Sequence, residues 1–376
     1  MYRTIDSYSE PRSILKLMKR PCAEMMPYEH DFLCGLIKMS RPQKIVEIGV
    51  AGGGTTAVIQ NCIEILGLST EFYSIDLNKE HYWIKGEKTG YLYQEVSDKF
   101  SKQNHKFYLG SLYADVAEEI GGDIDFLILD TVHFMPGEFL DFLYALPYLT
   151  KNAIVVFHDV SLGLINCSDA ICNKLLFDSI TGDKYWDITQ MEKGILPNIA
   201  AVQLNQDTLK SIEKVFSALS INWNYMPDFL TLRKYENFYK KYYSKECLHI
   251  FDAIIVNQIK MFYKKKSDIQ QYLLDLREEI KETSLFIYGA GRRGRALKSY
   301  LETNRIGYKG FVVSDEVDID DYRDGETNVY HLSDISKNAG KMLVAVADCS
   351  QIILSLYQKE YDFLLIPETV WTMWKV

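Results

Sequence analysis

The stretch Lys44-Ile-Val-Glu-Ile-Gly-Val-Ala-Gly-Gly-Gly-Thr-Thr56 decides the fold of this 376-residue chain. An apolar run that contains Glu47 ends at Gly49 and leads through three more glycines into a helical pattern. A buried strand that turns tightly into a helix presents bare backbone and a helix N-terminus to a ligand. Because Glu47 lies two residues before the first glycine, the ligand is expected to carry an amine or another positive charge.

Strands and helices alternate after this stretch. Further apolar strands are expected at Phe72–Ile75, Lys106–Leu109, Asp125–Leu129 and Ala153–Phe157. Helical patterns are expected at Pro27–Met39, Thr55–Leu66, Gly90–Lys102, Tyr113–Ile120 and Glu138–Leu149. Such alternation predicts a parallel sheet with helices on both faces. Two later apolar segments, Tyr185–Ile188 and Ile199–Leu204, would supply the last strands.

A second, smaller α/β unit is expected near the end of the chain. Its strands are expected at Leu285–Tyr288, Phe311–Val313, Met342–Val346 and Phe363–Ile366. One helix is expected between the first two strands, at Arg295–Glu302. The fold class is therefore α/β, with a first Rossmann-like sheet, a helical linker and a second Rossmann-like domain. The expected divisions are an N-terminal helical segment at 1–43, a first domain at 44–226, a linker at 227–283 and a last domain at 284–376.

The linker contains two apolar stripes with helical spacing. They are Leu248, Phe251, Ile255, Ile259 and Phe262, and then Ile269, Leu273, Leu276 and Ile280. Such stripes must bury against their own domains or against a second subunit. We favour a role in dimerisation, which makes the chain a homo-oligomer.

Composition excludes several classes of partner. The formal charge is −9, which leaves no basic surplus to neutralise the phosphates of nucleic acid. No apolar run approaches the roughly 18 residues that a membrane span requires. The seven cysteines are odd in number and form no C-x-x-C pair, so neither disulfides nor a zinc site are indicated. We expect a cytoplasmic protein that binds neither nucleic acid nor membrane.

The first glycine-rich segment resembles motif I of the class I S-adenosylmethionine-dependent methyltransferases, in the form E-x-G-x-x-x-G-G-[ST]. The resemblance implies that residues 44–226 bind S-adenosylmethionine. Asp76, 22 residues after Gly54, closes the second strand, where the family holds the ribose hydroxyls. Ser111 follows the third strand, where the family approaches the adenine ring. The implied donor-binding residues are Glu47, Gly49, Gly52, Gly53, Thr55, Asp76 and Ser111.

The fourth and fifth strands carry a second pattern. Asp125-x-x-x-x-Asp130-x-x-His133 is followed by an apolar strand that ends in His158-Asp159. This pattern resembles the branch that includes the cephalosporin-hydroxylase-like and rhamnosyl O-methyltransferase-like proteins. Some relatives, such as catechol O-methyltransferase, hold magnesium at the positions of Asp130 and Asp159. His158 departs from that pattern, because imidazole suits magnesium poorly, so the resemblance leaves the need for Mg²⁺ open.

His133 is the candidate general base, and the expected catalytic set also contains Asp130, Asp159 and His158. An ordinary histidine pKa near 6.5 suits removal of a hydroxyl proton at neutral pH. Alternatively, His133 and Asp130 only cap the helix that follows. The resemblance implies O-methylation, and the acceptor is expected to be a sugar or another small hydroxylated metabolite.

The second glycine-rich segment matches G-x-G-x-x-G at Gly289, Gly291 and Gly294, with Asp315 after the next strand. Arg292 and Arg293 add positive charge at a helix N-terminus, where anions bind. A bound nucleotide or nucleotide sugar and a degenerate fold used for packing are equally supported. This segment also agrees with two other functions for the chain. One is an oxidoreductase or epimerase that binds NAD(P) or a nucleotide sugar, and the other is a non-catalytic scaffold that binds ligands.

Overall fold

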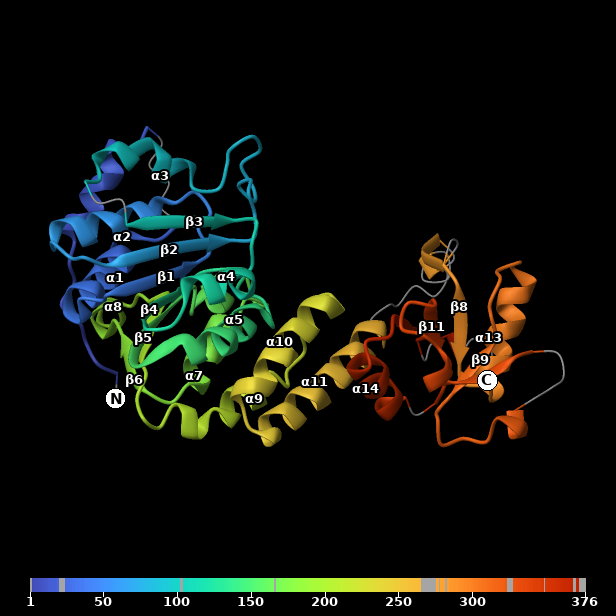
Figure 1. Ribbon diagram of the computed structural model, residues 1–376. Helices are drawn as coiled ribbons and strands as arrows, with labels where there is room; N and C mark the ends of the chain where they lie inside the picture. The colour runs from blue at the N-terminus through green and yellow to red at the C-terminus, as the bar shows by residue number, and fades with distance from the viewer. Residues whose placement is uncertain are drawn as a thin grey trace. The chain divides into compact units, whose positions relative to one another are not determined.

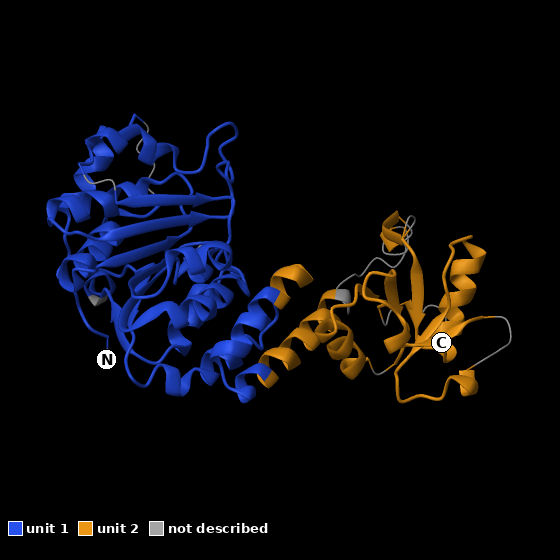
Figure 2. Cartoon of the chain, viewed as in Figure 1, with its two compact units in different colours: residues 1–225, 234–248 blue, residues 226–233, 249–376 orange. Residues whose placement is uncertain are grey.

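The computed structural model describes residues 2–19, 24–101, 104–165, 167–264, 275–276, 278–280, 283–322, 327–347, 349–367 and 370–371. The chain divides into two compact units, which Figure 2 distinguishes by colour. The first unit comprises residues 1–225 and 234–248, and the second comprises residues 226–233 and 249–376. Each unit contains one sheet, so the predicted α/β class with two sheets is confirmed. The predicted divisions at 43, 226 and 283 stay predictions.

The sheet of the first unit has seven strands in the order β3-β2-β1-β4-β5-β7-β6 (Figure 1). Their bounds are β1 Lys44–Ile48, β2 Glu71–Asp76, β3 His105–Leu109, β4 Ile124–Leu129, β5 Leu149–His158, β6 Asp183–Trp186 and β7 Ile199–Gln203. The first five strands pair in parallel, whereas β7 is antiparallel to both β5 and β6. All seven predicted strands are present.

Helices cover both faces of this sheet (Figure 1). They include α1 Pro27–Ser40, α2 Gly54–Ile65, α3 Tyr91–Val96, α4 Tyr113–Ile120, α5 Gly137–Ala145, α7 Cys172–Ser179 and α9 Glu213–Ala218. Ile45 of β1 belongs to the hydrophobic core that α1 and α2 form with the sheet. Because side chains alternate along a strand, Glu47 points to the same face as Ile45.

One predicted helix ends earlier than its apolar pattern. The helix expected at Glu138–Leu149 is α5, which ends at Ala145, and a short 3₁₀ turn then covers Leu146–Tyr148. Pro147 lies in this turn and has no N–H to continue the helix. Leu149 instead begins β5, which is therefore longer than the expected strand at Ala153–Phe157.

The second unit contains a five-stranded sheet in the order β10-β9-β8-β11-β12. Its elements are β8 Leu285–Tyr288, α13 Arg292–Thr303, β9 Phe311–Val313, β10 Val329–His331, β11 Lys341–Val344, α14 Ser350–Gln358 and β12 Phe363–Leu365. All the strand pairs are parallel. The edge strand β10 was not predicted, because three half-buried residues give no apolar run.

The helical segment contains α10 Phe229–Tyr242 and α11 Lys245–Lys264. In α11, Phe251, Ile255 and Ile259 are buried within the chain, so most of the first apolar stripe has partners there. Ile269 and Leu273 of the second stripe lie outside the described residues. A role in dimerisation therefore stays a prediction. Within the described residues, every helix is too short or too polar to cross a bilayer.

Candidate functional site

The predicted polar residues of the first unit lie at one edge of its sheet. Asp76 ends β2, Ser111 follows β3, Asp130 directly follows β4, and His158 ends β5 just before Asp159. These four strands run parallel, so their carboxyl ends share an edge. In open α/β sheets, ligands bind in the crevice at this edge.

The loop between β1 and α2 needs its glycines at two positions. Gly49 has φ +99°, and a Cβ atom there would lie 1.7 Å from the carbonyl oxygen of Asp130. Gly53 has φ +82°, and its Cβ would lie 2.9 Å from the Cα of Gly90. The loop therefore passes against the chain that follows β4, which brings the predicted donor site next to Asp130.

Asp76 holds the glycine-rich loop from the end of β2. Its Oδ2 accepts hydrogen bonds from the backbone N–H groups of Val50 (3.0 Å) and Ala51 (3.1 Å). Its backbone oxygen accepts a hydrogen bond from the N–H of Ser111 at 3.1 Å. The backbone N–H of Asn78 donates to the other carboxylate oxygen, Oδ1, at 2.8 Å. Because an ionised carboxylate has about four acceptor positions, these three bonds leave about one position for a hydroxyl group of a ligand.

Two other predicted donor-binding residues lie in the interior. Glu47 is 2% exposed, and its Oε2 accepts hydrogen bonds from the hydroxyls of Thr56 (2.9 Å) and Ser74 (2.6 Å). Burial raises the pKa of the Glu47 carboxyl to about 8, although these hydrogen bonds act to lower it. The Thr55 hydroxyl is also buried, 3.2 Å from Nε2 of His30. Direct contact of Glu47 or Thr55 with a ligand stays a prediction.

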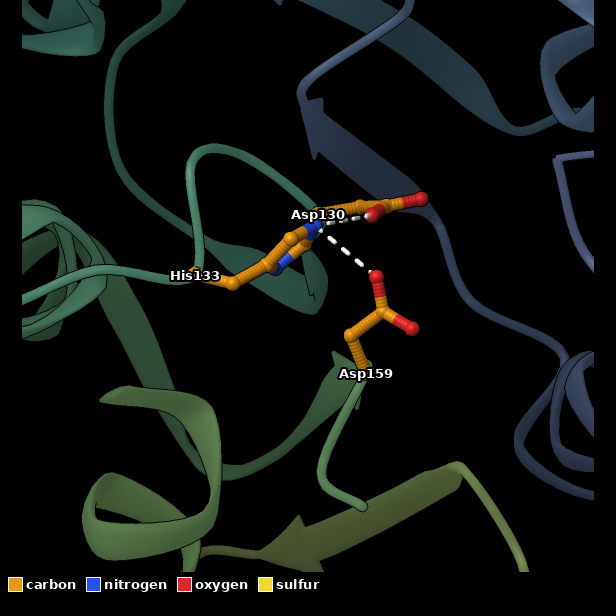
Figure 3. A group of neighbouring side chains, drawn as sticks. All are labelled: Asp130, His133 and Asp159. Carbon is orange, nitrogen blue, oxygen red and sulfur yellow. Dashed lines mark ion pairs between the residues drawn. The ribbon is translucent and has the colours of Figure 1, made fainter. Parts of the chain in front are cut away.

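Asp130, His133 and Asp159 converge at the carboxyl ends of β4 and β5 (Figure 3). His133 Nε2 lies 3.0 Å from Asp159 Oδ2 and 3.7 Å from Asp130 Oδ1. One ligand atom from each residue lies within 4.8 Å of the other two, which is close enough to hold one metal ion. The structure thus brings together the two predicted metal ligands and the predicted base.

The other side of the His133 ring faces Glu138. Its Nδ1 lies 3.3 Å from Glu138 Oε1, and the backbone N–H of His133 donates to the same oxygen at 2.6 Å. Glu138 is fully buried. A carboxylate that accepts the Nδ1 proton leaves Nε2 as the nitrogen that can bind a metal ion or a proton.

The charges of this group shift its protonation. Burial acts to lower the pKa of His133, but hydrogen bonds to Asp159 and Glu138 raise it to about 10. Burial acts to raise the pKa of Asp159, but the hydrogen bond from His133 and the charge of His158 lower it to about 2. Without a cation, His133 is therefore an imidazolium at neutral pH. Its positive charge then lies between the carboxylates of Asp130 and Asp159 and stabilises both.

His158 is enclosed by carboxylates on both sides of its ring. Nδ1 lies 3.0 Å from Asp130 Oδ1, and Nε2 lies 3.3 Å from Glu29 Oε2. Burial acts to lower the pKa of His158, but the charge of Asp130 and the hydrogen bond to it raise that pKa well above its ordinary value. Both ring nitrogens thus donate, so His158 orients Asp130 and is not a metal ligand in this arrangement.

The alternative role of His133 and Asp130 as helix caps does not fit the structure. The following helix, α5, begins at Gly137, and its N-cap is Pro136. His133 and Asp130 lie before that cap, in the loop that leads to it. Their side chains point to one another and to Asp159 (Figure 3).

Five residues around the site were not predicted: Glu24, Glu29, Glu138, Asn173 and Asn198. Glu24 Oε1 accepts a hydrogen bond from the N–H of Gly52 at 2.9 Å. Asn198 donates to Asp159, and Asn173 donates to the backbone oxygen of His158 at 2.6 Å. Only Glu138 carries a local signal, because it lies five residues after His133 on the same loop and helix start.

The donor atoms of the three-residue group restrict the ions that it could hold. Two carboxylates and one imidazole nitrogen suit a divalent ion that accepts both oxygen and nitrogen, such as Mn²⁺. Mg²⁺ prefers oxygen ligands and keeps several waters. The residues present fit a divalent cation, with Mn²⁺ better matched than Mg²⁺.

Residues 46–160 match the family model described as "Methyltransferase domain". This part of the chain is a methyltransferase domain. The match contains the glycine-rich loop, Asp76, Ser111 and all three residues of the possible metal site. The second unit lies outside the match.

Individual proteins resemble parts of the chain. Among curated proteins, the "Uncharacterized protein y4gI" of Sinorhizobium fredii is 24% identical over 133 residues, which cover 34% of this chain and 14% of that protein. An O-methyltransferase from Bacillus cereus, solved in complex with SAH, is 17% identical with a TM-score of 0.35; the likeness covers 51% of this chain and 86% of that one. The O-methyltransferase TomG of Streptomyces achromogenes, solved with SAM, is 14% identical with a TM-score of 0.37. The likeness covers 55% of this chain and 92% of TomG.

Proposed function

We propose that this chain uses S-adenosylmethionine to methylate a hydroxyl group of a small molecule, either a sugar or another hydroxylated metabolite. One observation carries the proposal. Within the methyltransferase domain, the glycine-rich loop packs against the backbone of Asp130, which belongs to the group that could bind an acceptor. Donor and acceptor sites would therefore adjoin at the same edge of the sheet.

The donor would bind along the loop between β1 and α2. Gly49 keeps this loop close to the end of β4, and Gly53 lets it approach Gly90. Asp76 would accept a hydrogen bond from the ribose. Ser111 would lie near the adenine ring. Because the sulfonium of the donor already activates the methyl group, the protein's main task is to align the acceptor oxygen with it.

The acceptor would bind beside Asp130, His133 and Asp159. These residues would hold a divalent cation, which lowers the pKa of a hydroxyl bound to it. Glu138 orients His133 for this role through Nδ1, and Asn198 orients Asp159 through a hydrogen bond. His158 fixes Asp130 from the other side.

A second route to the same reaction uses His133 as the general base, without a metal ion. The base must first lose its proton, which the pKa of about 10 disfavours at neutral pH. Asp159 and Asp130, which would hold a cation, therefore act with Glu138 to keep a metal-free His133 protonated. This contrast favours the route with a cation, and the two routes differ in their dependence on chelation and pH.

Transfer of a labelled methyl group tests the proposal. The protein would be incubated with S-adenosylmethionine labelled in its methyl group and with a mixture of small hydroxylated metabolites. We expect a labelled small molecule from the wild type and far less from Asp159→Asn, with Asp98→Asn as a control for the loss of an exposed carboxylate. The proposal fails if the wild type labels no small molecule although it binds the donor, or if both variants label equally.

A further inference from the structure

The second unit has the strand order of one half of a dinucleotide-binding fold. In chain order its strands lie 3-2-1-4-5, and all of them are parallel. The order reverses between β8 and β11, and ligands of such sheets bind at the carboxyl ends of the strands beside this point. A cavity of about 510 Å³ lies there, lined by the loops that follow β8, β9 and β11. This volume falls within the range of about 300–1,000 Å³ that is typical of small-molecule sites.

Two of the three glycines that follow β8, Gly289 in the loop and Gly294 in α13, are required by the fold. Gly289 has φ +106°, and a Cβ there would lie 2.5 Å from Cγ1 of Val346. A Cβ at Gly294 would lie 1.8 Å from the carbonyl oxygen of Gly289, so α13 could not approach β8 this closely. These are the turn and packing roles of the first and third glycines in the dinucleotide fingerprint.

Gly291 is different, because the fold does not require a glycine there. Its φ is −76°, and a Cβ added to it would meet no atom within 4 Å. Gly291 lines the cavity, so its missing side chain leaves bare backbone at the cavity wall. In the fingerprint, the second glycine lets the backbone approach a diphosphate closely. Ligand binding thus explains a glycine that packing leaves unexplained.

The charge of the cavity suits an anion. Arg292 and Arg293 line it at the N-terminus of α13, and none of the described residues that line it is acidic. Nη1 of Arg293 donates to the backbone oxygen of Val346 at 3.3 Å, which fixes this guanidinium at the wall. The helix N-terminus adds N–H groups and the positive end of the helix dipole.

We propose that this cavity binds the diphosphate group of a nucleotide. The phosphates would lie on Gly289–Arg293, and the nucleoside would lie along the apolar side chains of Val313, Val317 and Ile352. Asp315, the acidic residue that follows the fingerprint in the sequence, does not line the cavity. Its Oδ1 accepts a hydrogen bond from the N–H of Ser333 at 2.8 Å, and its Oδ2 lies 3.5 Å from Nζ of Lys359.

Ser314, next to Asp315 in the sequence, lines the cavity instead, with its Oγ 2.8 Å from the hydroxyl of Tyr288. A hydroxyl binds ribose less strongly than a carboxylate, since hydrogen bonds to charged groups are the stronger ones. Recognition therefore rests on the phosphates. The diphosphate could come from a free nucleoside diphosphate, a dinucleotide or a nucleotide sugar.

Calorimetric titration of the full chain with ADP and with UDP tests this site. We expect at least one of them to bind the wild type, and Gly291→Val to weaken that binding by about 10- to 100-fold, because its side chain fills the position of the phosphates. Gly307→Val is the matched control, since a Cβ at Gly307 also meets no atom within 4 Å and Gly307 lies outside the cavity. Arg292→Ala should weaken binding by a similar factor, and Lys298→Ala, on the same helix but outside the cavity lining, should not.

Titrations with NAD⁺ and UDP-glucose distinguish the sources of the diphosphate, and either one binding more tightly than its nucleoside diphosphate supports the site. Affinity for S-adenosylhomocysteine should be the same in all these variants, which separates this proposal from that of methyl transfer. The proposal is wrong if none of ADP, UDP, NAD⁺ and UDP-glucose binds the wild type at millimolar concentration. It is equally wrong if Gly291→Val, folded by circular dichroism, binds them as tightly as the wild type.

Discussion

Nδ1 of His133 lies 3.3 Å from the buried carboxylate of Glu138, on the side of the ring that faces away from Asp159. A histidine held in this way by a carboxylate presents its other nitrogen in a fixed direction, as metal-binding histidines do. The pair therefore links Glu138, buried in the first turn of α5, to the proposed acceptor site. It also gives the metal hypothesis a test that does not need the acceptor.

Replacing Glu138 should weaken metal binding without removing a ligand. We expect Glu138→Gln to lower the affinity for Mn²⁺ by about 10- to 100-fold, because the His133 ring loses its charged partner. Calorimetry with Mn²⁺ measures this affinity. Glu118→Gln, an exposed position on α4, is the matched control and should leave it unchanged. Equal affinities in Glu138→Gln and the control would show that the pair does not support a metal site.

Chelation and pH together separate the two routes to an activated acceptor. If Asp130, His133 and Asp159 hold a cation, EDTA should abolish methyl transfer and Mn²⁺ should restore it. If His133 is instead a metal-free base, activity should survive EDTA and rise with pH up to about 10, because only the unprotonated form accepts a proton. Initial rates with and without EDTA across this range decide the question, and the second outcome would contradict the proposed metal site.

Gly49 and Gly67 both have positive φ angles, +99° and +64°, but their surroundings differ. Gly67→Ala should cost only about 1–2 kcal/mol of backbone strain, since its Cβ meets no atom within 4 Å. Gly49→Ala should cost about 2–6 kcal/mol, because strain and a clash with the Asp130 carbonyl add together. Urea unfolding of both variants measures the difference. Similar losses of stability would show that the loop does not pack as closely on Asp130 as described.

Glu47 should make folding depend on pH. Its pKa rises from 4.5 to about 8 on folding because the carboxyl is buried. The folded state therefore keeps a proton that the unfolded state releases, so this contribution to stability is complete below pH 4.5 and is lost as pH rises through about 8. The loss is at most about 1.4 kcal/mol per pH unit.

Glu47→Gln removes this titration and should flatten the change in stability between about pH 5 and about pH 8, as measured by urea unfolding. Glu71→Gln, an exposed position on β2, is the control. If wild type and Glu47→Gln lose stability in parallel as pH rises, the Glu47 carboxyl is not held protonated in the folded state.

The strands and the edge that holds the site could be predicted because their signals are local. Apolar runs indicate the strands. The residues that follow parallel strands lie at the same edge of the sheet, so Asp76, Asp130 and Asp159 could be placed at one edge from the sequence. The interior contacts of Glu47 were not predicted, although its period-two relation to Ile45 directs it toward α2. The contact with a ligand that its spacing from the first glycine suggested stays a prediction.

The remaining partners could not be predicted because they are distant in sequence. Glu29 reaches His158 from α1, and Asn198 reaches Asp159 from the position just before β7. No local spacing specifies such pairs, which depend on how the helices and the antiparallel strand pack on the sheet. Asp315 illustrates the same limit in the second unit: its position after β9 was predicted, but the direction of its side chain depends on Ser333.

Titration of S-adenosylhomocysteine into the wild type, Asp76→Ala and the exposed control Asp98→Ala tests the central claim most directly. We predict that the wild type and the control bind one molecule per chain. Asp76→Ala should bind at least about tenfold more weakly, because each hydrogen bond to a charged group contributes about 1.5–3 kcal/mol. No binding by the wild type at millimolar concentration, or equal affinity in Asp76→Ala, would contradict the proposed donor site.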